Sequence, residues 1–325
     1  MTDAVVDRLL NSGEASVRFR VLANVLDEDL GSRDVIKLRQ EIRSSPRVRL
    51  LLSERDQDGR MPSHPYAKWY GAHWVLASLA DLGYPPGDET LIPLREQVYN
   101  WLFGKSHQQS IRTIAGRVRR CASQEGNAIY YLLTLGLADR RVDELTDRLC
   151  TWQWPDGGWN CDKNPEAVHS SFMESLIPLR ALALHARLTG NRRPQEAVAR
   201  AAEIFLKRRL YKGQKDGDII RGDFVKLHYP CYWHYDILFG LVVMAEADLI
   251  GDERCRDALD LLESKRLPDG GFPAEKKYYQ ATGKPRSGRS LVDWGGTSKR
   301  HMNEFVTADA LYVLKRSGRL KGVER

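Results

Sequence analysis

A six-residue apolar pattern that recurs six times constrains the fold of this chain more than any other feature. Each copy has apolar residues at its third and sixth places and continues apolar at helical spacing. The copies begin at Arg20, Trp74, Asn127, Glu174, Asp236 and Asp309. More polar, amphipathic helices are expected between them, at 91–103, 142–152, 194–210 and 254–265.

A helix that is apolar on most faces must be buried on most faces. The pattern therefore predicts an all-α fold with one domain over residues 1–325. We expect an (α/α)6 toroid, in which six helical hairpins form an apolar inner ring and an amphipathic outer ring. An open α-solenoid built from the same hairpins is the alternative arrangement.

Composition and the N-terminal sequence are typical of a cytoplasmic globular protein. Apolar residues make up 42% of the 325 residues, and no run approaches the roughly 18 apolar residues that a membrane helix needs. The first residues, MTDAVVDRLLNSGE, do not resemble a secretion signal. The five cysteines are odd in number and irregularly spaced, which predicts reduced thiols and a cytoplasmic location.

Two sequence motifs resemble the repeats of a known superfamily. The segment 153–159, QWPDGGW, places a Pro-Asp-Gly-Gly turn between two tryptophans, and 265–273, KRLPDGGFP, is a degenerate second copy. Together with VTADAL at 306–311, they resemble the QW motif and inner-helix start of the squalene-cyclase and prenyltransferase α/α-toroids. The resemblance implies the toroid fold and an isoprenoid-type substrate. Fold alone does not determine chemistry.

The chain lacks the reaction motifs of these relatives. Neither the D-x-D-D acid of class II cyclases nor the D-D-x-x-D motif of class I enzymes is present. The positions that correspond to the zinc triad of protein prenyltransferases fall on Glu166, Val168 and Trp233. A shift of one residue would bring in His169 or His234.

Candidate catalytic residues lie near the expected starts of the inner helices. Trp74, Asn127, Glu174, Asp236 and Asp309 occupy one equivalent place, so in a closed ring they would face a common pit. Carboxylates there are also stabilised by the helix dipole, by about 0.3–1 kcal/mol each, without any catalytic role. Two carboxylates in one pit would separate in pKa and supply an acid and a base.

We therefore expect Glu174 and Asp236 to act as acid and base, with His169, His234 and Asp309 as further catalytic candidates. Aromatic and polar residues on the same rim are expected to bind substrate. These are Trp69, Tyr70, Trp74, Asn127, Tyr232, Trp233, His228, His301 and Glu304.

The segment 228–236 carries the densest group of functional side chains. The spacing His-x-x-Cys-x-x-His at His228, Cys231 and His234 offers three metal ligands with an open fourth position, the pattern of catalytic zinc. Its aromatic residues equally fit the lining of an apolar pocket, and Cys231 as a nucleophile is a further alternative. Cys161 with Asp162, near His169, is a weaker metal candidate.

Positive charge is concentrated in three long insertions, 104–122, 207–228 and 272–303. They carry five, seven and seven Lys/Arg against zero, three and two acidic residues. In a ring of hairpins they would emerge on the rim where the inner-helix N-termini open, which favours an anion there. Nucleic acid is disfavoured as a partner, because the basic residues would surround the opening of the pit and would not follow a groove.

These features predict an enzyme that performs acid–base chemistry on an anionic or amphipathic, isoprenoid-like small molecule in a central aromatic pit. One alternative is a carbohydrate-active (α/α)6 hydrolase or lyase, in which the aromatic residues stack on sugar rings. Another is a toroid that binds a ligand or a protein without catalysis.

Overall fold

The computed structural model describes residues 2–320, and the predicted all-α class is confirmed. The strands are short: β1 (Arg112–Ile114) pairs antiparallel with β2 (Arg117–Arg119), and β3 (Gln280–Ala281) pairs parallel with β4 (Arg289–Ser290). Among residues 2–320, no helix combines the length and the apolar character needed to cross a membrane.

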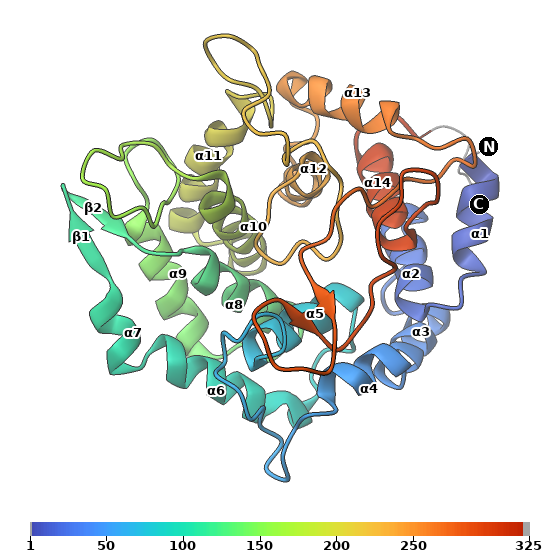
Figure 1. Cartoon of the computed structure of the whole chain (residues 1–325), viewed down its shortest axis with the longest axis horizontal. Coiled ribbons are helices and arrows are strands. Elements are labelled where there is room, and N and C mark those ends of the chain that lie inside the picture. Colours follow the sequence, from blue (N-terminus) through green and yellow to red (C-terminus); the bar gives the residue numbers. More distant parts are fainter. Residues whose placement is uncertain (1, 321–325) are drawn as a thin grey trace.

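The apolar copies form the inner helices. They are α2 (Ala15–Arg20) with the π-helical η1 (Val21–Val25), α5 (Ala72–Leu82), α8 (Ser123–Thr134), α10 (Phe172–Thr189), α12 (Ile237–Glu246) and α14 (Glu304–Arg316). In sequence order, α5 contacts α8, α8 contacts α10, α10 contacts α12 and α12 contacts α14. The last inner helix, α14, packs against α2 and η1, so the end of the series meets its beginning (Figure 1).

The remaining helices lie along the outline of the molecule in Figure 1. They are α1 (Thr2–Leu10), α3 (Arg33–Arg43), α4 (Pro46–Leu52), α6 (Ile92–Leu102), α7 (Lys105–Ser110), α9 (Arg140–Trp152), α11 (Arg192–Leu206) and α13 (Arg256–Ser264), with the 3-10 turns η2 (Glu89–Leu91) and η3 (Glu253–Cys255). Burial follows the predicted difference in character. All residues of α12 from Ile237 to Ala245 are buried, whereas α9 buries one stripe that includes Val142, Leu145 and Leu149.

The turn at 153–159 joins three helices. The Trp159 indole donates to the Leu149 carbonyl of α9 (2.9 Å), and the Gln153 amide donates to the Ala197 carbonyl of α11 (2.8 Å). The Trp159 amide donates to the Ser175 hydroxyl of α10 (3.0 Å). Gly157 has φ +105°, and a Cβ there would lie 2.3 Å from the Arg200 carbonyl oxygen, so the turn requires glycine.

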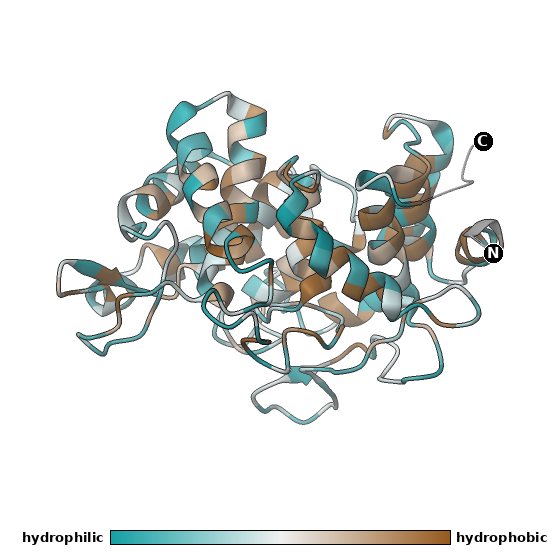
Figure 2. Ribbon diagram, turned by 90° about the horizontal axis from the view of Figure 1, so that it is seen from above, coloured by the Kyte–Doolittle hydropathy of each residue, from teal (hydrophilic) through white to brown (hydrophobic). Residues whose placement is uncertain are grey.

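The three basic insertions form mainly irregular structure. Figure 2 shows many of the irregular segments gathered on one side of the helices. Residues 104–122 form α7 and the β1–β2 hairpin, and residues 272–303 include β3 and β4. Trp294 of the third insertion is buried, as is Tyr232, which follows the second insertion. The insertions therefore contribute to the core as well as to the surface.

Candidate functional site

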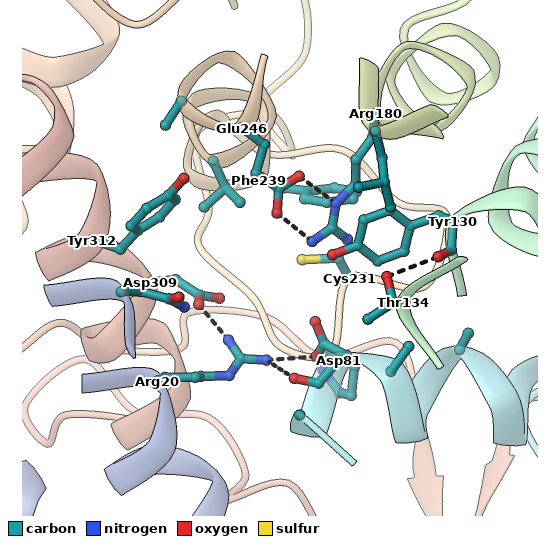
Figure 3. Close-up of a pocket in the computed structure, with 18 of the residues that line it drawn as sticks. Arg20, Asp81, Tyr130, Thr134, Arg180, Cys231, Phe239, Glu246, Asp309 and Tyr312 are labelled. Atoms are coloured by element: carbon teal, nitrogen blue, oxygen red, sulfur yellow. Dashed lines mark hydrogen bonds and ion pairs between the residues drawn. The ribbon is translucent and has the colours of Figure 1, made fainter. Parts of the chain in front are cut away.

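A central cavity of about 560 Å³ lies between the inner helices. Its charged lining comes from the middle and the last turns of these helices: Arg20, Asp81, Arg180, Glu246 and Asp309 (Figure 3). Tyr229, Pro230, Cys231, Tyr232 and Trp294, from the segments that precede α12 and α14, also line it. The lining corrects one expectation, because Trp74, Glu174 and Asp236, near the starts of their helices, are not among its residues.

Arg20 is the centre of the first charged group in this cavity. Its side chain is buried and pairs with Asp81 (Nη2 to Oδ2, 2.8 Å) and with Asp309. Arg20 Nη2 also donates to the Tyr229 hydroxyl (3.2 Å), and that hydroxyl donates to Asp81 Oδ2 (2.6 Å). The Arg20 guanidinium thus connects α2 to α5, to α14 and to the segment before α12.

Asp309 has an altered acidity. Burial raises its pKa to about 6, because the Arg20 charge offsets only part of the desolvation and the nearby Asp81 charge adds to the rise. Burial lowers the pKa of Arg20, but the charges of Asp309 and Asp81 more than offset this, so the guanidinium stays charged. At neutral pH, a fraction of Asp309 therefore holds a proton next to a permanent cation.

Arg180 and Glu246 form the second charged group. Arg180 donates through Nε and Nη2 to the two carboxylate oxygens of Glu246, each at 2.6 Å. Its guanidinium also lies 3.7 Å from the centre of the Tyr130 ring, a cation–π distance. The pair connects α10 to α12 and fixes the wall opposite Arg20 in Figure 3.

Aromatic rings and further arginines complete the cavity. Tyr130, Phe239 and Tyr312 supply apolar faces, and Arg39, Arg187 and Arg316 join the lining with Asp248. Among residues 2–320, five arginines and four carboxylates therefore line a chamber whose other walls are mostly apolar and aromatic.

The helix boundaries show that the predicted column of polar residues is not one equivalent place. Trp74 and Glu174 are the third residues of their helices, Asn127 is the fifth and Asp309 is the sixth. Asp236 instead precedes α12 as its N-cap. Asn127 and Asp309 accordingly line the central cavity, whereas Trp74, Glu174 and Asp236 are not among its lining residues.

The contacts of Asp236 and His234, two of the catalytic candidates, are those of structural residues. Asp236 is buried, accepts from the backbone amides of Phe239 and His228 (2.8 Å each), and pairs with His228 Nδ1 at 2.6 Å. His234 is stacked between Trp233 (4.0 Å) and Tyr278 (3.4 Å), and burial lowers its pKa to about 3. The His234 ring is therefore neutral in the physiological pH range.

The other predicted residues are dispersed. Trp69 stacks on Tyr232 with ring centres 3.9 Å apart and meets Trp74 edge-on at 4.6 Å. Tyr70 lies under the Arg289 guanidinium at 4.9 Å, and Glu304 accepts from the Ser12 hydroxyl at 2.8 Å.

His169 and His301 are exposed on the surface. Of all the predicted site residues, the central cavity brings together Asn127, Cys231, Tyr232 and Asp309.

The predicted metal ligands do not converge. Within residues 2–320, the one group of three or more His, Cys, Asp or Glu whose ligand atoms all lie within 4.8 Å of one another is Cys121, Cys161 and Glu174. His228, Cys231 and His234 form no such group. Glu166 and Val168, at two of the positions that correspond to the prenyltransferase zinc triad, are exposed, so that triad does not fit this chain.

A second cavity, of about 790 Å³, lies beside α6, α7 and α8. Tyr66, His107, Arg120 and Gln124 are among its lining residues. His107 Nε2 lies 2.8 Å from the buried Glu125 carboxylate, and Arg120 Nη2 lies 2.8 Å from the same imidazole. The cavity therefore has a polar, positively charged wall.

Sequence reasoning missed the charged residues that organise the central cavity, namely Arg20, Asp81, Arg180 and Glu246. A usable signal was present, because each is a charge in a segment that is largely apolar. Such a charge is expensive to bury without a partner, so it indicates a paired or functional position.

Comparison with solved structures gives a similarity to a terpene cyclase. No protein-family model matches the chain, and no curated protein matches it. A solved structure of a variant of the type II terpene cyclase MstE from Scytonema, in complex with its product merosterolic acid A, aligns over 97% of this chain and 99% of that chain. The identity is 13% and the TM-score 0.30, values that establish neither common ancestry nor function.

Proposed function

We propose that this chain is an (α/α)6-toroid enzyme that performs acid–base chemistry on an amphipathic, isoprenoid-like molecule in the central cavity. Asp309 is the general acid in this proposal. The observation that carries it is a partly exposed carboxyl with a pKa of about 6 in the lining of an aromatic chamber.

The acidity of Asp309 suits proton donation near neutral pH. A general acid is most effective when its pKa lies near the working pH, because a useful fraction is then protonated and the protonated form still gives up its proton readily. Arg20 fixes the carboxyl by an ion pair, and burial keeps its pKa above the usual range. Catalysis of this kind contributes typically a factor of 10² to 10⁴ in rate.

The remaining lining fits a substrate with an apolar body. Proton transfer to a neutral apolar molecule creates positive charge, which the faces of Tyr130, Phe239 and Tyr312 would stabilise. A volume of about 560 Å³ lies within the usual range of small-molecule sites.

Charge at the same cavity favours an anionic head group on that substrate. Arg187 and Arg316 belong to the last turns of α10 and α14, and Arg39 of α3 also lines the cavity. If a phosphate or carboxylate bound to these arginines, the apolar part of the molecule would extend toward Asp309.

The test is a binding and turnover assay with farnesyl and geranylgeranyl diphosphates, the corresponding alcohols, straight-chain alkyl diphosphates and oligosaccharides. We expect thermal stabilisation by the isoprenoid diphosphates and conversion detected by mass spectrometry. Asp309→Asn should keep binding and reduce turnover at least 100-fold, with Asp248→Asn as the control on the same lining.

Three results would overturn the proposal. One is wild-type turnover in the Asp309→Asn variant, and another is preferential turnover of oligosaccharides. The third is the absence of any binding across the isoprenoid panel.

A further inference from the structure

Three segments that are distant in sequence bring two thiols and a carboxylate together at the N-terminal ends of α8 and α10. Cys121 follows β2, Cys161 follows the turn at 153–159, and Glu174 lies in the first turn of α10. Their ligand atoms all lie within 4.8 Å of one another, and Cys161 Sγ is 3.8 Å from Glu174 Oε1.

The surrounding backbone holds the two cysteines side by side. Arg119 and Asn160 form a parallel bridge, which places the residues that follow them next to each other. The Arg119 side chain donates to the Ala167 carbonyl (2.9 Å), and the Trp154 indole donates to the Val118 carbonyl (2.8 Å). These contacts fasten the segment that carries Cys161 to the strand that leads to Cys121.

Glu174 is fixed independently. Its Oε2 accepts from the backbone amide of Ser123 at 3.0 Å, which leaves Oε1 turned toward Cys161. Two thiols and a carboxylate thus lie together in one partly buried group, and these are donor types that bind zinc in proteins.

The spacing agrees with tetrahedral zinc. Zn–S distances of about 2.3 Å and Zn–O distances of about 2.0–2.2 Å put neighbouring ligand atoms roughly 3.5–3.8 Å apart in a tetrahedron. Thiolate ligands favour zinc over magnesium and calcium, which prefer oxygen.

We propose that Cys121, Cys161 and Glu174 bind one Zn²⁺ through Sγ, Sγ and Oε1. Three protein ligands leave the fourth position for water or a substrate atom, as in catalytic zinc sites. The site is separate from Asp309, because Cys121, Cys161 and Glu174 are not among the lining residues of the central cavity. Its binding does not depend on the function proposed above.

The second cavity lies close to this site in the chain. Tyr66, Arg120 and Gln124 line that cavity, and Arg120 directly precedes Cys121. An anionic ligand in the second cavity would lie beside both the metal and the Arg120 guanidinium.

The test is a titration of the reduced, chelator-treated full-length protein with Co²⁺ and then Zn²⁺. We expect one equivalent of Co²⁺, with thiolate-to-cobalt charge-transfer absorption in the near ultraviolet and tetrahedral bands in the visible, both removed by one equivalent of Zn²⁺. Cys121→Ser and Cys161→Ser should each weaken Zn²⁺ binding at least 100-fold, and Glu174→Gln at least tenfold. Cys150→Ser and Cys231→Ser are the controls and should bind as the wild type does.

A second measurement uses the wild-type protein and does not depend on how the variants fold. Bound Zn²⁺ should protect Cys121 and Cys161, but not Cys150, from iodoacetamide, as mapped by peptide mass spectrometry. The proposal is wrong if the reduced protein takes up no stoichiometric Co²⁺ or if the Cys121 and Cys161 variants bind as tightly as the wild type. It is also wrong if the two thiols only form a disulfide on oxidation and show no metal protection when reduced.

Discussion

Removing the Arg20 guanidinium tests the central charged group directly. In Arg20→Met, Asp81 and Asp309 lose the cation that lies between them, and the Tyr229 hydroxyl loses a donor. Loss of one partner from a buried ion pair typically costs 3–5 kcal/mol, because the other charge stays buried and unpaired. The Arg20 side chain is only 7% exposed, but Asp81 keeps 32% exposure, so we expect about 4 kcal/mol at pH 8.

That cost should depend on pH in a defined direction. Without Arg20, the two carboxyls relieve their repulsion by taking up a proton, so at pH 5 we expect about half the loss found at pH 8. With an unfolding entropy of about 2.1 cal/mol/K per residue, 325 residues give ~0.7 kcal/mol/K, and 4 kcal/mol corresponds to about 6 °C in Tm.

The assay is urea unfolding and thermal unfolding of the wild type, Arg20→Met and Arg20→Met/Asp309→Asn at both pH values. The double variant should recover part of the loss at pH 8, because it removes one of the two unpaired carboxylates. Arg8→Met is the control, since its ion pair with Asp269 is exposed and should contribute less than about 0.5 kcal/mol. A loss below 1 kcal/mol in Arg20→Met, or an equal loss at both pH values, would refute the reasoning.

Three further outcomes are expected. First, the raised pKa of Asp309 means that the folded state holds its proton more tightly than the unfolded state, so this stabilisation is complete below pH 3.8 and is lost as pH rises through about 6. In pH-dependent urea unfolding, Asp309→Asn should therefore gain up to about 3 kcal/mol relative to the wild type between pH 4 and pH 7, and a flat difference would contradict the assignment. Second, Glu246→Gln should cost about 3 kcal/mol in urea unfolding because Arg180 stays buried without a charged partner, whereas Asp248→Asn, whose side chain is 71% exposed, should stay within about 0.5 kcal/mol. Third, Gly157→Ala should cost about 3 kcal/mol through positive φ and the clash with Arg200, whereas Gly251→Ala, with no atom within 4 Å, should be neutral in the same assay.

Much of the fold follows from the sequence because its signals are local. An apolar helix interior such as LFGLVVMA in α12 can only be buried, and the amphipathic stripe of α9 marks a covering helix. The PDGG turn likewise predicts positive φ at Gly157, which the structure contains. Local chemistry determines each of these features without reference to distant residues.

The cavity could not be derived in the same way, because its lining depends on where each helix begins. Alignment of the six-residue copies treats Asp236 and Asp309 as equivalents, yet the N-cap of α12 is Asp236 and that of α14 is Asn303. The alignment does not show which polar residue accepts hydrogen bonds from the free backbone amides at the start of each helix. A shift of several residues in helix start turns a cavity-lining position into a capping position.

The difference between Asp236 and Asp309 also explains why an acid near a helix start is a poor guide to catalysis. Asp236 satisfies the amides of His228 and Phe239, so any protonation of its carboxyl would leave those buried donors with a weaker acceptor. In α14 the N-cap is Asn303, whose side-chain oxygen accepts hydrogen bonds from the amides of Phe305 and Val306. Asp309, in the second turn, is therefore released from backbone capping, and its proton affinity is set by burial and by Arg20. Under the proposed function, capping by Asn303 leaves Asp309 free for proton transfer, so the pair Asn303 and Asp309 is the feature to seek in related sequences.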